Sequence, residues 1–478
     1  MSASALSHRA PTPRRRGGWF RALVHASPPR FAIVVFSGLV LIWTSLLSLP
    51  IASRSGEITP FADALFTAVS AICVTGLSTV DMATHWSLFG EIMILLGLQI
   101  GGVGVLTIAS LLAVTVTGRL GLRQRLLVAN DTNPMRATRG ASESQAIGLG
   151  EIGGLLRAVV TSLLVIELGL TALIVPRLMI EGLDFAHALW NGFYLAASAF
   201  TNTGFVPLPN GLTPFLGDYY LLSVLAIGVF LGSIGFPVIF ALYRFVTAES
   251  QRRKHLGLHS KLTLAATIAL VIFGWILIAG LEWGNPATLG DASAGRTLYD
   301  SLYMSVMTRS GGLGIIDPMA MHGSTRLVLD MLMFVGGGSA STAGGIKVTT
   351  LAVLFLAAYS EARGYRDIQA FSRRIPTEVL RVAVSVLIWG ATIVLVASIT
   401  IMQMTGASLD ETLFEVISAF GTCGLSSGLS GTLPDSGKYV LAATMWAGRV
   451  GTVTLATAVA ATARSRMFRF PEERPIVG

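Results

Sequence analysis

The chain has 478 residues, a formal net charge of +8 and a mean hydropathy of +0.69. Hydrophobic residues make up 53% and charged residues 13%, against about 25% charged residues in an average soluble protein. So few polar side chains cannot coat the soluble domains that this length would allow. Composition therefore excludes a cytosolic enzyme, a nucleic-acid-binding protein and a disordered scaffold. The chain is predicted to be an all-α integral membrane protein.

The first predicted crossing covers residues 31–53, which contain no charged side chain. A helix of this length spans the roughly 30 Å of hydrocarbon in a bilayer. Six arginines lie between residue 9 and residue 30. A signal peptide has a shorter apolar region and a cleavage site of small residues, so a retained helix is favoured.

Seven further apolar stretches bring the predicted number of crossings to eight. They lie at 86–117, 155–176, 219–246, 261–281, 326–359, 379–404 and 438–463. Of the 34 basic residues, 26 lie before residue 31, in the connections 118–157, 244–261 and 361–381, or after residue 463. The other connections are acidic. By the positive-inside rule the basic pieces and both termini are expected in the cytoplasm, with the chain in the inner (plasma) membrane.

Four segments too short and too polar to cross lie between the helices of each outward-facing pair. Each begins near an acidic residue or a histidine, continues as an apolar helix with aromatic residues, and reaches a glycine followed by an apolar residue. The segments are 61–81, 185–207, 298–318 and 409–429, with matched glycines Gly76, Gly204, Gly312 and Gly424. These glycines are 128, 108 and 112 residues apart. The spacing predicts four helix–pore-loop–helix repeats with pseudo-fourfold symmetry around one pore.

Non-helical backbone at membrane depth is tolerated only inside protein or along a water-filled cavity. A half-crossing helix followed by a glycine can point carbonyl oxygens inward, because glycine adopts backbone angles that a Cβ disfavours. Four such segments around an axis can replace the hydration shell of a cation, as in potassium filters. A single segment could equally be a packed re-entrant turn, but four in register favour a pore.

The strings VTGL (74–77), NTGF (202–205), SGGL (310–313) and TCGL (422–425) resemble the four filters of the Trk/Ktr/HKT superfamily of potassium transporters. The strings SAFGTCGLSSGL (418–429) and GGGSASTAGGIK (336–347) resemble its fourth filter and its glycine-rich helix break. The resemblance covers about 31–465 and is to the eight-crossing Ktr-type subunit. Gly311 and Leu313 depart from the usual Ala and Phe, and Cys423 from the more common Val.

The resemblance implies potassium as the transported ion, and Gly76, in place of serine, favours potassium over sodium. It leaves open sodium as an activator or coupling ion, and implies no covalently bound cofactor. The expected partners are a second copy of the chain and a cytoplasmic ring of regulatory subunits that bind dinucleotide or ATP, with no nucleic acid. The residues expected to bind the ion are Val74, Thr75, Gly76, Asn202, Thr203, Gly204, Ser310, Gly311, Gly312, Thr422, Cys423 and Gly424.

The sixth crossing is interrupted by ten residues, five of them glycine. These residues are Gly336, Gly337, Gly338, Ser339, Ala340, Ser341, Thr342, Ala343, Gly344 and Gly345. Each glycine costs a helix interior roughly 1 kcal/mol, so a loop is predicted here. Close helix packing is the alternative, but it favours spaced small residues rather than a continuous run. The resemblance implies that this loop is the gate.

Arg449 lies inside the eighth predicted crossing, where a charged side chain is costly and typical of a functional site. Snorkelling to the cytoplasm and a structural ion pair are the alternatives. The resemblance implies that Arg449 meets the loop below the filter and is a positive barrier to ions.

The prediction divides the chain into a cytoplasmic N-terminus (1–30), four repeats (31–117, 155–246, 261–360 and 379–465) and a cytoplasmic C-terminus (466–478). No nucleophile–base set or nucleotide fingerprint indicates an enzyme. A proton- or sodium-coupled carrier of another solute remains the alternative, although such carriers typically show inverted repeats. Glu91 and Glu167 are interpreted as either coupling-ion sites or helix–helix contacts. Cys73 and Cys423 are interpreted as packed small residues.

Overall fold

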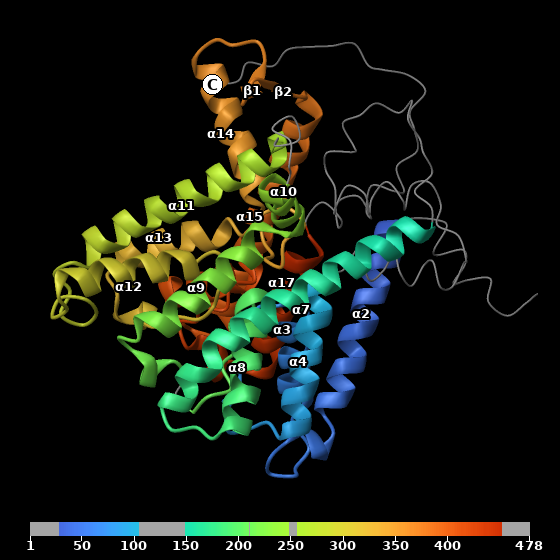
Figure 1. The fold of residues 1–478 in the computed structure, drawn as a ribbon, viewed down its shortest axis with the longest axis vertical. Helices are drawn as coiled ribbons and strands as arrows, with labels where there is room; N and C mark the ends of the chain where they lie inside the picture. The colour runs from blue at the N-terminus through green and yellow to red at the C-terminus, as the bar shows by residue number, and fades with distance from the viewer. Residues whose placement is uncertain (1–27, 105–148, 210, 248–255, 452–478) are drawn as a thin grey trace, which may run out of the picture.

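The computed structural model describes residues 28–104, 149–209, 211–247 and 256–451, which are mostly helical (Figure 1). The predicted C-terminal piece, residues 1–27 of the predicted N-terminal piece and residues 118–148 of the basic connection 118–157 lie outside the described residues. So do residues 105–117 and 452–463, which were predicted to complete the second and eighth crossings. The first and fourth predicted repeats are therefore described without their last residues.

Four long helices correspond to the predicted first crossing of each repeat. They are α2 (Pro28–Leu47), α7 (Leu149–Ile180), α11 (Leu258–Glu282) and α15 (Thr377–Thr405). In α7, α11 and α15, apolar stretches of 24, 25 and 29 residues are long enough to cross a membrane. At 1.5 Å per residue they extend for about 36–44 Å, more than the hydrocarbon core requires. Their exposed faces are apolar, as at Ile272 and Ile388. The protein is a multi-pass membrane protein.

Four shorter helices occupy the predicted pore-loop segments. They are α3 (Phe61–Cys73), α8 (Phe185–Phe200), α12 (Ala294–Met307) and α16 (Leu409–Gly421). With 13 to 16 residues they extend for only about 20–24 Å. Side chains cap three of them: Asp184, Ser293 and Ser408 each accept a hydrogen bond from a first-turn amide. Their C-terminal halves are buried, so these helices end inside the protein.

The second helices of the repeats are α4 (Leu88–Val103), α9 (Tyr219–Ile234) with α10 (Phe236–Thr247), α13 (Gly323–Phe334) with α14 (Val348–Ala362), and α17 (Asp435–Val450). Helices α4, α9 and α17 stop at Gly104, Gly235 and Gly451, with φ of 96°, 87° and 85°. Residues with a Cβ rarely adopt this backbone conformation, so a glycine ends each of these helices. The sequence predicted 219–246 as one crossing, but α9 and α10 meet at 102° around Gly235.

The break between α13 and α14 contains the whole glycine-rich run, as its composition predicts. A parallel bridge between Val335 and Ile346 joins the two sides of the break. Beyond α14 an antiparallel hairpin, β1 (Ile368–Ala370) and β2 (Arg373–Ile375), precedes α15. This hairpin was not predicted. In Figure 1 it lies with α14 and α10 at one end of the molecule.

A hydrogen bond or salt bridge joins each of the four short helices, here called the pore helices, to the second helix of another repeat. Lys438 of α17 binds Asp63 of α3 at 2.8 Å, and Trp190 of α8 donates to Glu91 of α4 at 2.8 Å. The same relation holds for the hydroxyls of Tyr299 (α12) and Ser223 (α9) at 2.9 Å, and for Asp410 (α16) and Arg326 (α13) at 2.5 Å. These pairs connect α4 with α8, α9 with α12, α13 with α16 and α17 with α3. Each repeat is thus bonded to the next one along the chain, and the fourth is bonded to the first, so the four repeats form a closed ring.

Candidate ion-conduction site

Every pore helix is followed by a residue in the left-handed backbone region. These residues are Val74 (φ 58°), Asn202 (59°), Ser310 (67°) and Thr422 (46°). A β-branched residue such as Val74 or Thr422 is rare in this conformation and persists only where the surroundings hold it. Two residues further on, each chain turns again at a glycine with positive φ: Gly76 (88°), Gly204 (87°), Gly312 (66°) and Gly424 (91°). The four predicted filter segments therefore share one backbone shape.

The four glycines lie against one another's segments in a cyclic order. A Cβ on Gly76 would overlap the carbonyl oxygen of Thr203, and one on Gly204 would stand 3.1 Å from that of Gly311. A Cβ on Gly312 would stand 2.7 Å from the oxygen of Cys423, and one on Gly424 would overlap that of Thr75. Each glycine thus meets the carbonyl that precedes the glycine of the next segment. The structure brings the predicted filter residues into one cluster.

Serine residues support three of the four segments at a matched position, six residues before the filter glycine. The amides of Thr75, Thr203 and Cys423 donate to the serine carbonyls of Ser70, Ser198 and Ser418 at 2.8, 2.8 and 2.9 Å. The Oγ atoms of Ser70 and Ser418 also accept from the amides of Gly76 and Gly424, at 3.0 and 3.1 Å.

The third segment is built differently. Val306 stands at the serine position, so no hydroxyl is available to Gly312. The amide of Gly311 instead donates to the carbonyl of Met307 at 2.7 Å. Ser310 donates its hydroxyl to the carbonyl of Gly421 at 3.1 Å and so ties this segment to the end of α16. The departure at Gly311 coincides with this change of support.

Glu415, inside α16, anchors the chain that leaves the fourth segment. Its fully buried carboxylate accepts from the amide of Ser427 at 2.7 Å and from the hydroxyls of Ser426, Ser427 and Ser430. A buried carboxylate with so many donors has its charge spread over fixed dipoles. The sequence analysis did not single out Glu415. The run of serines after Gly424 was the feature of the sequence that could have indicated a buried acceptor such as Glu415.

The glycine-rich loop 336–345 packs directly against two filter segments. The hydroxyl of Thr342 donates to Asn202 Oδ1 at 3.1 Å, and the amide of Gly344 donates to Thr422 Oγ1 at 2.9 Å. Asn202 and Thr422 are the left-handed residues of the second and fourth segments. The loop is also bonded to the last turn of α9, since the amide of Gly338 donates to the carbonyl of Ser233 at 2.7 Å.

Arg449 reaches this loop from α17. Its Nη1 donates to the carbonyl of Thr342, and its Nη2 donates to the carbonyl of Gly101 in α4. Arg449 lies in the last turn of α17 rather than well inside a longer helix, because the helix stops before Gly451. A cation is favourable at a helix C-terminus. The predicted gate residues are therefore in contact with one another.

Arg309, directly before Ser310, is a charged residue that the sequence analysis missed. It is fully buried beside the third filter segment. The signal was present, since Arg309 is the one charged side chain between Asp300 and Asp317.

The acidic residues left open by the sequence make helix–helix contacts. Glu91 accepts from Trp190, and Arg54 lies 3.8 Å from it. Glu167 of α7 accepts from Gln99 of α4 at 2.6 Å. Cys73 and Cys423 are both buried, free thiols.

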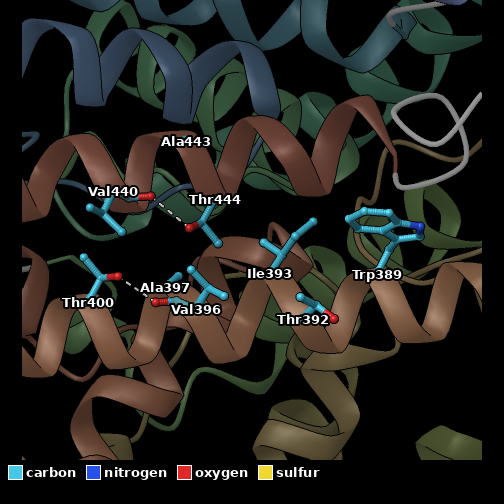
Figure 2. Close-up of a pocket in the computed structure, with 9 residues that line it drawn as sticks. All are labelled: Trp389, Thr392, Ile393, Val396, Ala397, Thr400, Val440, Ala443 and Thr444. Atoms are coloured by element: carbon cyan, nitrogen blue, oxygen red, sulfur yellow. Dashed lines mark hydrogen bonds between the residues drawn. The ribbon is translucent and has the colours of Figure 1, made fainter. Parts of the chain in front are cut away.

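A groove of about 410 Å³ lies between α15 and α17, away from the filter residues (Figure 2). Trp389, Ile393 and Val396 of α15 face Val440 and Thr444 of α17 across it. The two threonines drawn with hydrogen bonds, Thr400 and Thr444, donate within their own helices. The lining of the groove is therefore mainly apolar.

Comparisons with known proteins identify the family of the chain. A family described as cation transport protein, TrkH, matches residues 17–469. The Ktr system potassium uptake protein D of Bacillus subtilis is 35% identical, with 96% of this chain and 99% of that protein covered. The potassium/sodium uptake protein NtpJ of Enterococcus hirae is 33% identical over 95% and 97%. The solved potassium transporter TrkH of Vibrio parahaemolyticus has a TM-score of 0.65 at 17% identity over 89% and 85%, which is a likeness of fold.

Proposed function

Since the chain belongs to the TrkH family of cation transport proteins, a family of ion transporters and not of enzymes, we propose that it takes up potassium through its four filter segments. The observation that carries this proposal is the cyclic contact of Gly76, Gly204, Gly312 and Gly424 with the carbonyls of the neighbouring segments. Carbonyl oxygens gathered around one axis can replace the water that a potassium ion loses.

The architecture proposed for this function is eight crossings in four repeats with pseudo-fourfold symmetry. The repeats are 31–117, 155–246, 261–360 and 379–465. The four bonds between a pore helix and the second helix of another repeat support this arrangement. They join each repeat to the next, and the bond between α17 and α3 joins the fourth repeat to the first. The helix bounds support it too, since every repeat contains a long helix, a short buried helix and a second helix that ends or breaks near a glycine.

Within this pore the carbonyls of Thr75, Thr203, Gly311 and Cys423 are the proposed ligands. The remaining predicted filter residues shape the turns that aim these carbonyls. The left-handed conformation of Val74, Asn202, Ser310 and Thr422 supports this role, because it reverses the chain at the end of each pore helix. Glycine at all four filter positions favours potassium over sodium.

The loop 336–345 is the proposed gate, with Arg449 as its positive barrier. The contacts of Thr342 with Asn202 and of Gly344 with Thr422 support this role, because they place the loop next to two filter segments. A guanidinium beside a narrow passage repels a potassium ion. Opening then requires the loop and Arg449 to separate.

The proposal includes a homodimer in the cell membrane, cytoplasmic termini and a cytoplasmic ring of nucleotide-binding regulatory subunits. Support comes from the basic connections 244–261 and 361–381, which suit a cytoplasmic face. Sodium is a candidate activating or coupling ion, because NtpJ is named for potassium and sodium together.

The test is flux in proteoliposomes that contain the purified full chain, with rubidium as the potassium probe. Rubidium and sodium uptake are measured with and without a sodium gradient. Rubidium uptake that exceeds sodium uptake supports the proposal, and dependence on the gradient identifies coupling. Equal uptake of both ions, or no uptake of either by folded protein, would overturn it.

A further inference from the structure

We propose that Arg309 is a positioning residue that couples the third filter segment to the gate loop, so that loop movement changes the ion preference of the filter. The inference rests on the proposed function. It concerns a side chain that is neither a filter residue nor part of the loop.

The first observation is the burial of the Arg309 side chain. It is 0% exposed, and its Nε and Nη1 atoms are buried without a hydrogen-bond partner among the residues that the structure describes. No carboxylate in those residues forms an ion pair with it. A buried charge without a counter-ion is a poor source of stability, and apolar replacements of buried charges are often tolerated. A purely structural role is therefore a weak reason to keep an arginine here.

The second observation is the bond that its guanidinium makes. Arg309 Nη2 donates to the carbonyl of Leu332, in the last turn of α13. The final carbonyls of a helix have no partner within the helix, and a cation at this end also opposes the helix dipole. Since α13 ends at Phe334 and the loop begins at Gly336, Arg309 holds the point from which the gate loop departs.

The third observation is a second route between the same segment and the loop. The carbonyl of Arg309 accepts from Asn202 Nδ2 at 3.1 Å, and Asn202 Oδ1 accepts from the hydroxyl of Thr342 at 3.1 Å. The backbone of Arg309 is thus bonded to the middle of the loop through one side chain. The next residue, Ser310, carries the left-handed turn of the third segment.

Together these bonds connect the start of the loop, through Leu332, and its middle, through Thr342 and Asn202, to the third filter segment. Displacement of the loop would pull on Leu332 and on Asn202, and both act on Arg309. The third segment lacks the serine support of the other three and is held instead by its bonds to Met307, Gly421 and Tyr303, so a pull on Arg309 acts on the residue directly before its turn. Arg309 therefore links loop position to the geometry of the third filter segment, in addition to the direct bond between Gly344 and Thr422 at the fourth.

The experiment compares Arg309→Met, which keeps side-chain length without charge, with Arg309→Lys, which keeps the charge. Rubidium flux per folded protein, the rubidium-to-sodium flux ratio and the melting temperature are measured in the full chain. For Arg309→Met we expect a folded protein with flux raised about tenfold, the factor of one charge-assisted hydrogen bond, and with a lower ratio. Arg309→Lys should restore most of both. Arg296→Met, in the first turn of α12, is the control: it loses the ion pair with buried Asp300 and should lower the melting temperature while flux per folded protein and the ratio stay at the parent values.

The inference is overturned if Arg309→Met changes only the melting temperature and leaves flux per folded protein and the ratio at the parent values. Should Arg309→Met fail to fold, Thr342→Val tests the same connection from the loop. Its loss of the bond to Asn202 should lower the rubidium-to-sodium ratio, and an unchanged ratio overturns the coupling. Absence of ion flux in the parent protein would instead overturn the proposed function.

Discussion

The third and fourth filter segments have the same backbone turns but different supports. In the fourth, Ser418 receives the amide of Gly424, and Glu415 holds the serines that follow. In the third, Val306 replaces the serine, and the nearest charge is the buried Arg309. Glu415 and the serines that follow therefore hold the chain that leaves the fourth segment. In the third segment, Tyr303 donates to the carbonyl of Leu313 at 2.9 Å, and further bonds reach α13, α16 and Asn202.

This difference coincides with the place where the gate loop leaves the third repeat. The loop bonds directly to the second and fourth segments, at Asn202 and Thr422, and it reaches the third segment through Asn202 and Arg309. The comparison indicates that the fourfold shape of the filter is shared among the repeats, while contact with the loop is direct in the fourth segment and indirect in the third.

The largest expected effect comes from the feature that both segments share. Gly312→Ala and Gly424→Ala should each abolish selective rubidium flux, because the added Cβ would meet the carbonyl of Cys423 or Thr75. Gly428→Ala is the matched control, since Gly428 also has positive φ (85°) but open space at its Cβ position. It should cost only the left-handed strain of about 1–2 kcal/mol in the free energy of unfolding. Tolerance of Gly312→Ala alone would show that the third segment is not an equal part of the ring.

The next effect should come from Arg449, which joins the helix after the fourth segment to the loop of the third repeat. Arg449→Ala should raise basal rubidium flux about tenfold, the change given by a barrier lowered by about 1.4 kcal/mol. Arg449→Lys keeps the positive charge and should stay near the parent. Flux is normalised to folded protein, so that a fall in yield is not mistaken for gating. Equal flux in the alanine variant and the parent would exclude Arg449 as the barrier.

A smaller effect is expected at Glu415, which accepts from three serines after the fourth segment, whereas Tyr303 at the matched position donates one hydrogen bond to the carbonyl of Leu313 in the third segment. Glu415→Gln replaces an acceptor oxygen by an amide group that faces serine donors, and should lower the free energy of unfolding by about 1.5–3 kcal/mol. Selectivity should decline with it, because the chain after Gly424 loses its anchor. Thermal unfolding and the rubidium-to-sodium ratio measure the two effects. Glu411→Gln, in the capping box of the same helix, should leave the ratio unchanged.

The smallest expected effect is the loss of stability when the hydroxyl of Ser418 is removed, compared with removal of the hydroxyl of Ser198. Ser418→Ala removes the bond to the amide of Gly424 and should cost about 1 kcal/mol of stability. Ser198 holds the matched position in the second segment, but its Oγ has no hydrogen-bond partner among the described residues. Ser198→Ala should therefore change stability less than Ser418→Ala. Equal losses in thermal unfolding would mean that the hydroxyl bond contributes nothing.

Much of the helix pattern could be predicted from the sequence, because a long apolar run and a glycine-rich break are local features. The long helices α7, α11 and α15 and the interruption at 335–347 lie where composition placed them. The bend at Gly235 was not predicted, since one glycine in an apolar run has many structural uses. The hairpin at 368–375 was missed because its strands have only three residues each.

The candidate filter was also visible in the sequence, since four glycines recur after similar short helices. Each filter turn requires a positive φ, and the tolerance of a positive φ depends on residue type, which the sequence gives directly. Which carbonyl each glycine faces depends on segments more than a hundred residues away, and only the tertiary structure decided that. The bonds of Arg449 to Thr342 and to Gly101, 348 residues away, and the burial of Arg309 are of the same kind. No periodicity in the chain specifies such contacts, because they depend on how separate helices pack together.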